Sequence, residues 1–171
     1  MRTATLQLQE FLATRLNLVI CLAGFAAPFI FPSPQIVTGT IVNTLFFVSA
    51  EKLARKDWYA ALILPSLGAF AHGMLFGPQT IFLAYFLPVI WLGNYAQVEL
   101  FSFLRSRGYA AGTIAAAAAK SLLLFGAANA YYALHAVPQV FITSMGAIQF
   151  ITACLGGMAA YFITHSIKSH E

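Results

Sequence analysis

Long apolar segments separated by short turns occupy almost the whole chain, and they constrain its fold more than any other feature. Only 8% of the residues are charged, against about 25% in an average soluble domain. A helix needs about 20 mostly apolar residues to cross a bilayer, so 171 residues leave room for six crossings and little else. Transmembrane β-strands alternate apolar and polar residues, whereas these segments are apolar on every face. We therefore expect an all-α integral membrane protein.

Prolines, glycines and charged turns divide the apolar sequence into six expected transmembrane helices. Pro32–Pro34 follows the first helix, a charged turn at 51–57 follows the second, Gly77-Pro78 ends the third, and Arg105–Gly108 ends the fourth. Together the helices form a single transmembrane domain over residues 1–171. The expected spans are 11–31, 35–50, 58–76, 80–104, 109–134 and 138–165.

The lysines and arginines predict the orientation of these helices, because cytoplasmic loops of membrane proteins are enriched in both residues. If the N-terminus is cytoplasmic, the expected outer turns contain no lysine or arginine. Both termini are therefore expected in the cytoplasm, with the chain in a bacterial inner membrane. The net charge of +4 then reflects topology, and no nucleic-acid partner is expected. The inner segments contain Arg2, Lys52, Arg55, Lys56, Arg105, Arg107 and Lys168.

Lys120 is the polar residue that most needs an explanation, since it lies deep in the fifth expected helix. A lysine at the centre of a membrane helix costs about 2.5–3.5 kcal/mol on insertion scales. One interpretation is a buried ion pair between Glu99 and Lys120, bridged by Asn94 or Asn43. The other is that Lys120 contacts an anionic ligand or relays a conformational change.

The residues expected in the outer half of the membrane include many aromatic and uncharged polar side chains and no carboxylate. This composition suits a neutral or anionic small molecule that stacks and forms a few hydrogen bonds. A divalent metal would require carboxylates or clustered histidines, so neither a metal nor another cofactor is expected. No catalytic or phosphate-binding motif occurs, which argues against an enzyme.

Helix one contains the small-xxx-small pair Ala23 and Ala27, a spacing that lets helices approach closely in lipid. This pair predicts a docking surface for a partner helix.

Five segments in order give the chain a resemblance to a known family. They are TGTIVN at 38–43, HGMLFGP at 72–78, LPVIWLGN at 87–94, Lys120 followed by LLLF at 122–125, and QFITACLGG at 149–157. With its size and topology, the chain resembles the S components of energy-coupling factor (ECF) transporters. These six-helix membrane proteins capture vitamins or related micronutrients.

The resemblance implies an S-component-like bundle that binds a vitamin or heterocycle near the outer surface. The loops after the first and third helices and helices four to six would hold it. It also implies that Ala23 and Ala27 contact a transmembrane coupling subunit, which two ATPase subunits drive. The candidate substrate-binding residues are His72, Gln79, Tyr85, Trp91, Asn94, Asn129, Tyr132 and Gln149.

Two other classes of function stay open at this point. A membrane scaffold or assembly subunit would have no ligand pocket and would tolerate substitution of Trp91, Asn94 and Asn129. An intramembrane enzyme would need a nucleophile and a base at one depth, and the sequence offers only His72 with Ser66.

Overall fold

The computed structural model describes residues 2–73 and 75–166, and their fold is helical apart from one short extended segment. This confirms the all-helical class expected from the sequence. Three of the helical elements are single turns or little more, and the rest are long. In chain order the elements are α1 Arg2–Ile30, α2 Gln35–Lys52, η1 Arg55–Asp57, α3 Trp58–His72, β1 Leu75–Pro78, η2 Gln79–Phe82, α4 Leu83–Leu104, α5 Tyr109–Ala133, α6 Val140–Met145 and α7 Ala147–Ser166.

Within the described residues, four segments are long and apolar enough to cross a membrane: 10–30, 77–104, 109–133 and 140–166. Many large apolar side chains on their outer surfaces are exposed, as Leu22, Leu122 and Phe162 illustrate at 61%, 68% and 63%. Water would disfavour such a surface, whereas lipid tails match it. The chain is therefore a membrane protein.

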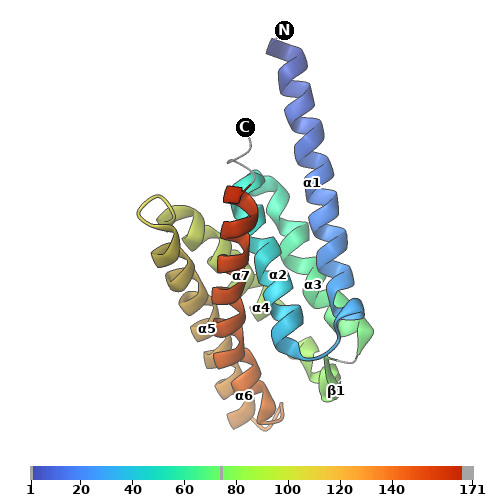
Figure 1. Ribbon diagram of the computed structural model, residues 1–171. Helices are drawn as coiled ribbons and strands as arrows, with labels where there is room; N and C mark the ends of the chain where they lie inside the picture. Colours follow the sequence, from blue (N-terminus) through green and yellow to red (C-terminus); the bar gives the residue numbers. More distant parts are fainter. Residues whose placement is uncertain (1, 74, 167–171) are drawn as a thin grey trace.

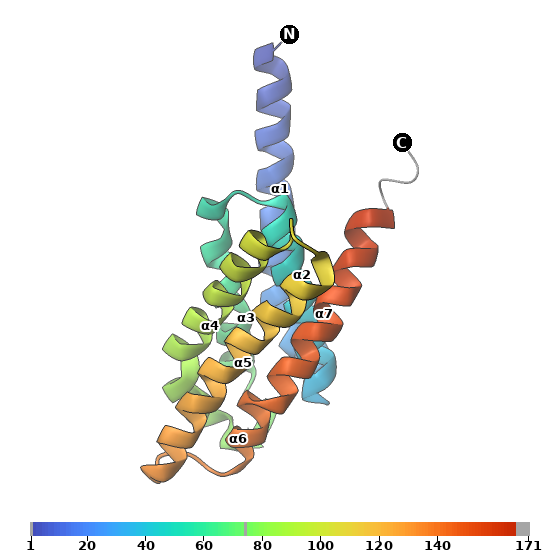
Figure 2. The same cartoon turned by 90° about the vertical axis from the view of Figure 1, so that its left-hand side faces the viewer.

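The helices run side by side as one bundle (Figures 1 and 2). The start of α1 and the end of α7 lie at the same end, together with the turns that contain Arg55 and Arg105 (Figure 1). Segment β1 and helix α6 lie at the opposite end. Helix α1 is about 44 Å long at 1.5 Å per residue, and its N-terminal part extends beyond the rest of the bundle.

Close helix contacts bring together residues that are distant in sequence. Helix α2 packs along α7, α4 along α5, and α1 along α3. At the α2–α7 contact, a Cβ on Gly156 would lie 2.7 Å from the Cβ of Asn43, which is closer than such atoms approach. Glycine at this position therefore lets α7 press directly on the backbone of α2 and fixes the position of Asn43.

Two buried apolar clusters stack along the bundle. The first cluster surrounds Phe46, Phe47 and Phe101 and joins the second half of α2 to the second half of α4. The second, around Phe86, Phe141 and Met145, lies toward β1 and α6. The rings of Phe86 and Phe141 stack with centroids 5.1 Å apart.

The third and sixth helices of the structure differ from the spans expected from the sequence. Helix α3 ends at His72 because Gly73 adopts φ 72°, a left-handed conformation that terminates helices. The chain then continues as β1, where Gly77 also has a positive φ of 56°. The expected helix at 138–165 is divided into α6 and α7 at Gly146. Helix α1 begins well before residue 11.

Candidate functional site

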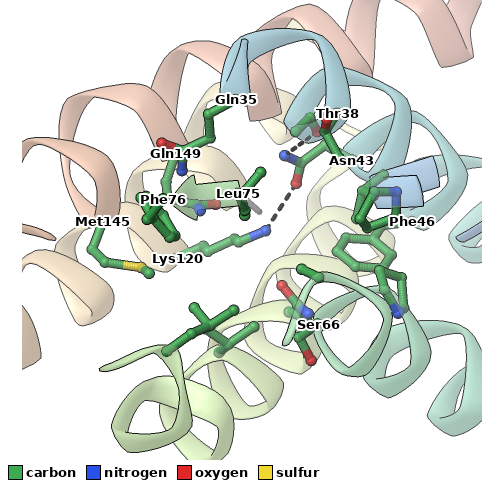
Figure 3. A pocket seen from close by; sticks show the side chains of 18 residues that line it. Gln35, Thr38, Asn43, Phe46, Ser66, Leu75, Phe76, Lys120, Met145 and Gln149 are labelled. Atoms are coloured by element: carbon green, nitrogen blue, oxygen red, sulfur yellow. Dashed lines mark hydrogen bonds between the residues drawn. The ribbon is translucent and has the colours of Figure 1, made fainter. Parts of the chain in front are cut away.

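Helix α2 presents one face, on which Gln35, Thr38 and Asn43 form a polar stripe, to the interior of the bundle. Gln35, Thr38, Gly39, Asn43 and Phe46 recur at the spacing that returns to one face of a helix. All five line a cavity of about 80 Å³ that lies where the two apolar clusters meet. The other residues around it come from α1, α3, β1, α4, α5, α6 and α7. Figure 3 shows side chains from these elements converging on one space.

Lys120 of α5 extends into this cavity and is only 3% exposed. Its Nζ donates a hydrogen bond of 2.9 Å to Oδ1 of Asn43 (Figure 3). The ammonium also lies 5.0 Å from the ring centroid of Phe46, within the range of a cation–π contact. An ammonium has three donors, so this contact with Asn43 leaves two for other partners.

Asn43 is fixed with its carbonyl toward Lys120. Its Nδ2 donates to the Gly39 carbonyl at 2.8 Å and to Oγ1 of Thr152 at 3.2 Å. Both amide hydrogens are thereby used, and only the oxygen is free to face the cavity. Because Asn43 is 1% exposed, its amide cannot exchange these partners for water without opening the bundle.

Asn94 of α4 lines the same cavity, and its side chain carries an acceptor without a partner. Its Nδ2 donates to the Leu62 carbonyl at 2.8 Å, and the residue is 2% exposed. Its Oδ1 is buried and has no hydrogen-bond partner among the described residues. Buried polar atoms are nearly always hydrogen-bonded, so this oxygen is an acceptor that a bound molecule could satisfy.

Segment β1 covers the cavity at the end away from the termini. Leu75 and Phe76 line it, and the Phe76 ring packs 4.8 Å from that of Phe141. Thr80 anchors the segment: its Oγ1 accepts from the Phe76 N–H at 2.9 Å and donates to the Gly77 carbonyl at 2.8 Å.

The residues lining the cavity include one ammonium and several amides and hydroxyls, and none of them is a carboxylate. The described part of the chain has no group of three or more His, Cys, Asp or Glu residues able to hold a metal ion. A cation would be repelled by Lys120, whereas an anion would be attracted and only partly shielded by water. The arrangement suits binding of a small anion.

Three of the expected substrate-binding residues belong to this site. Asn94 and Gln149 line the cavity. Trp91 lies just behind it, because its Nε1 donates a hydrogen bond of 2.8 Å to Oγ of Ser66, which is a lining residue.

The other five expected residues lie outside the cavity lining. Gln79, Tyr85, Asn129 and Tyr132 are exposed on the surface of the bundle. The amide of Asn129 donates to Phe125 on its own helix. His72 packs its ring against Phe29, with centroids 4.9 Å apart.

The expected ion pair between Glu99 and Lys120 is wrong. Glu99 instead forms a salt bridge of 2.6 Å with Arg55 and accepts a hydrogen bond of 2.9 Å from Tyr95. Glu99 is close enough to the turn at Arg55 to reach it, whereas Lys120 points into the cavity toward α2. Of the two bridging residues considered, Asn43 is the one that contacts Lys120.

The small-residue pair on α1 also differs from expectation. Ala27 is 3% exposed and therefore packs within the chain itself, and Ala23 is half-buried. Ala27 is thus unavailable to a partner helix. The exposed face of α1 instead presents Leu18, Leu22 and Phe25.

Several lining residues were absent from the expected substrate-binding set: Gln35, Thr38, Asn43, Ser66, Leu75, Phe76 and Met145. Part of this set had a signal in the sequence. Gln35, Thr38 and Asn43 form the polar stripe of a mostly apolar helix, and polar groups in membrane helices normally face the bundle interior. Leu75 and Phe76 had no such signal, because their role depends on the end of α3 at His72.

The chain matches no protein-family model, no curated protein and no solved structure.

Proposed function

We propose that this chain is the substrate-capturing membrane subunit of a micronutrient uptake transporter, similar to the S components of ECF transporters. It would bind a small molecule from the outer side of a bacterial inner membrane. Energy would come from a separate transmembrane coupling subunit with two ATPase subunits. In this proposal the chain binds and delivers its substrate without chemical change.

The observation that carries the proposal is the cavity around Lys120. Burying an ammonium that is 3% exposed and has one amide as its hydrogen-bonding partner costs free energy in a membrane helix. A scaffold subunit gains nothing from it, whereas a binding protein uses the charge and the unpartnered Asn94 oxygen. Segment β1 lines the cavity and lies at one end of the bundle, where the proposal places the outer surface.

The proposal requires six crossings, two more than length and composition alone indicate. Helices α2 and α3 are about 27 and 22 Å long, against about 30 Å for the hydrocarbon core. Both run alongside the longer helices (Figures 1 and 2), and β1 extends the path of α3. The basic turns at 52–56 and 105–107 would then lie in the cytoplasm.

Helix α1 is the proposed contact with the coupling subunit. Its exposed side chains Leu18, Leu22, Phe25 and Phe29 lie four, three and four residues apart and so form one continuous ridge. This ridge replaces the Ala23 and Ala27 pair as the docking surface. Leu22→Ala and Phe25→Ala should prevent co-purification of the coupling subunit but spare substrate binding. Leu122→Ala, on the exposed face of α5, is the matched control.

Ligand-dependent stability tests the binding function. The purified protein in detergent would be heated with each member of a panel of water-soluble vitamins and heterocyclic acids. A true ligand should raise the melting temperature in proportion to the logarithm of its concentration. The proposal fails if no compound stabilises the wild-type protein and if none is released from it on denaturation.

A further inference from the structure

We infer that the cavity selects an organic carboxylate that also carries an N–H donor, with the carboxylate on Lys120 and the N–H on Oδ1 of Asn94. The inference rests on the proposed binding function and specifies its substrate class. Two buried groups on neighbouring helices carry it, and each has unused hydrogen-bonding capacity.

The charge of the ligand follows from what surrounds Lys120. The nearest hydrogen-bonding partner is the neutral carbonyl of Asn43 at 2.9 Å, and no acidic residue lines the cavity. Glu99, the acidic residue on α4, is held by Arg55. A carboxylate ligand would supply the missing negative charge and accept from the two remaining ammonium donors.

The need for an N–H donor on the ligand follows from Asn94. Its Nδ2 is held by the Leu62 carbonyl at 2.8 Å, which fixes the amide orientation and leaves Oδ1 buried without a partner among the described residues. A ligand without an N–H or O–H at this position would leave that oxygen unsatisfied. The site should therefore discriminate against a molecule of equal shape that has an ether oxygen there.

The size of the ligand follows from the volume of the cavity. About 80 Å³ is well below the 300–1,000 Å³ of sites for drug-sized ligands. The apolar walls formed by Phe46, Phe76 and Met145 suit a flat ring. A compact heteroaromatic acid meets all three requirements.

Three compounds of nearly equal shape test the inference: pyrrole-2-carboxylate, furan-2-carboxylate, which lacks the N–H, and pyrrole-2-carboxamide, which lacks the charge. Their dissociation constants would be measured by calorimetry on the purified protein in detergent. Small molecules released from the denatured protein would be identified by mass spectrometry in the same preparation. We expect pyrrole-2-carboxylate to bind at least about 10-fold more tightly than either analogue.

Two variants assign the two contacts. Lys120→Met keeps most of the length of the side chain, removes the charge and should abolish the preference for the acid over the carboxamide. Asn94→Leu should abolish the preference for pyrrole over furan and retain the preference for the acid. Ser121→Ala is the control, since Ser121 neighbours Lys120 on α5, is buried, and does not line the cavity.

The outcomes separate this inference from the proposed function. If the protein binds or releases a neutral compound and Lys120→Met leaves that binding unchanged, the inference is wrong while the binding function stands. Stabilisation by chloride with no binding of the three compounds would assign Lys120 to an inorganic anion and would also overturn the inference. If the wild-type protein binds none of the compounds and releases none, both are wrong.

Discussion

The contact between Asn43 and Lys120 makes a prediction about stability that does not depend on any ligand. Replacing Asn43 by leucine retains the approximate shape of the side chain but removes the acceptor of the ammonium. It also removes the bonds to Gly39 and Thr152. Leaving a buried charge without its partner costs about 3–5 kcal/mol. We expect Asn43→Leu to lower the free energy of unfolding by about 3 kcal/mol, because the lost partner is a neutral amide.

Lys120→Met should cost far less although it removes the same hydrogen bond. The variant leaves Oδ1 of Asn43 unpaired, at a cost of about 1–3 kcal/mol. It also removes a charge whose burial in a membrane helix costs about 2.5–3.5 kcal/mol. The two contributions nearly cancel, so the change in unfolding free energy should be within about 1 kcal/mol of zero.

The double variant separates the contact from its surroundings. When the ammonium is absent, Asn43→Leu removes only the hydrogen bonds to Gly39 and Thr152. Such a hydrogen bond contributes about 0.6 kcal/mol on average to the stability of a membrane protein. The double variant should therefore be about 1 kcal/mol less stable than wild type, giving a coupling energy of about 2 kcal/mol.

Unfolding in mixed micelles of dodecyl maltoside and SDS, followed by the fluorescence of Trp58 and Trp91, provides the measurement. Asn129→Leu is the control, because that asparagine is exposed and bonds only to its own helix at Phe125. It should change stability by less than about 0.5 kcal/mol. Additive effects of the two substitutions, with coupling below about 0.5 kcal/mol, would refute the assignment of Asn43 as the partner of Lys120.

Three further predictions concern packing, orientation and the cover of the cavity. Gly156→Ala should destabilise the protein by about 1–3 kcal/mol, because the added Cβ would lie 2.7 Å from the Cβ of Asn43. Gly126→Ala is the control, because a Cβ there would have nothing within 4 Å. In the same micelle titration it should be neutral or stabilising by up to about 1 kcal/mol. Single cysteines at Lys56 and Arg107 should react with an impermeant maleimide only in inverted vesicles, and one at Gln79 only in intact cells; the opposite pattern would reverse the orientation. Thr80→Val removes both hydrogen bonds of the Thr80 hydroxyl. Hydrogen exchange at the Phe76 amide should therefore accelerate about 10-fold or more. An unchanged exchange rate would mean that Thr80 does not hold β1.

The sequence was informative wherever composition or helical periodicity decides the outcome. The scarcity of charge in the long segments predicts the membrane class, because a lipid-facing surface must be mostly apolar. Lys120 and Asn129 are nine residues apart, a spacing that puts them on opposite faces of a helix, and in the structure one is buried and the other exposed. The same reasoning could have identified the polar stripe of α2 at Gln35, Thr38 and Asn43.

Partners across helices could not be predicted in the same way. Depth along the membrane suggested Glu99 for Lys120, but depth does not fix rotation about the helix axis. Close approach of α7 at Gly156 brings Asn43 into position, and that contact joins residues over 100 positions apart. The position of β1 at the cavity was not expected from the sequence, because a left-handed Gly73 ends α3 earlier than hydrophobicity indicates.

The choice of an amide rather than a carboxylate beside Lys120 leads to the sharpest prediction about the site. An aspartate at position 43 would neutralise the ammonium within the fold, whereas the asparagine carbonyl holds it by a dipole and leaves its charge available to a ligand. Asn43→Asp should therefore be more stable than Asn43→Leu by about 2 kcal/mol, since the charge regains a partner. It should nonetheless bind pyrrole-2-carboxylate no better than Lys120→Met does, because the carboxylate at position 43 competes for the same donors and repels the ligand. Calorimetry and the micelle titration on one preparation measure both properties. Undiminished acid binding by the stable aspartate variant would show that the charge of Lys120 serves the fold and not the ligand.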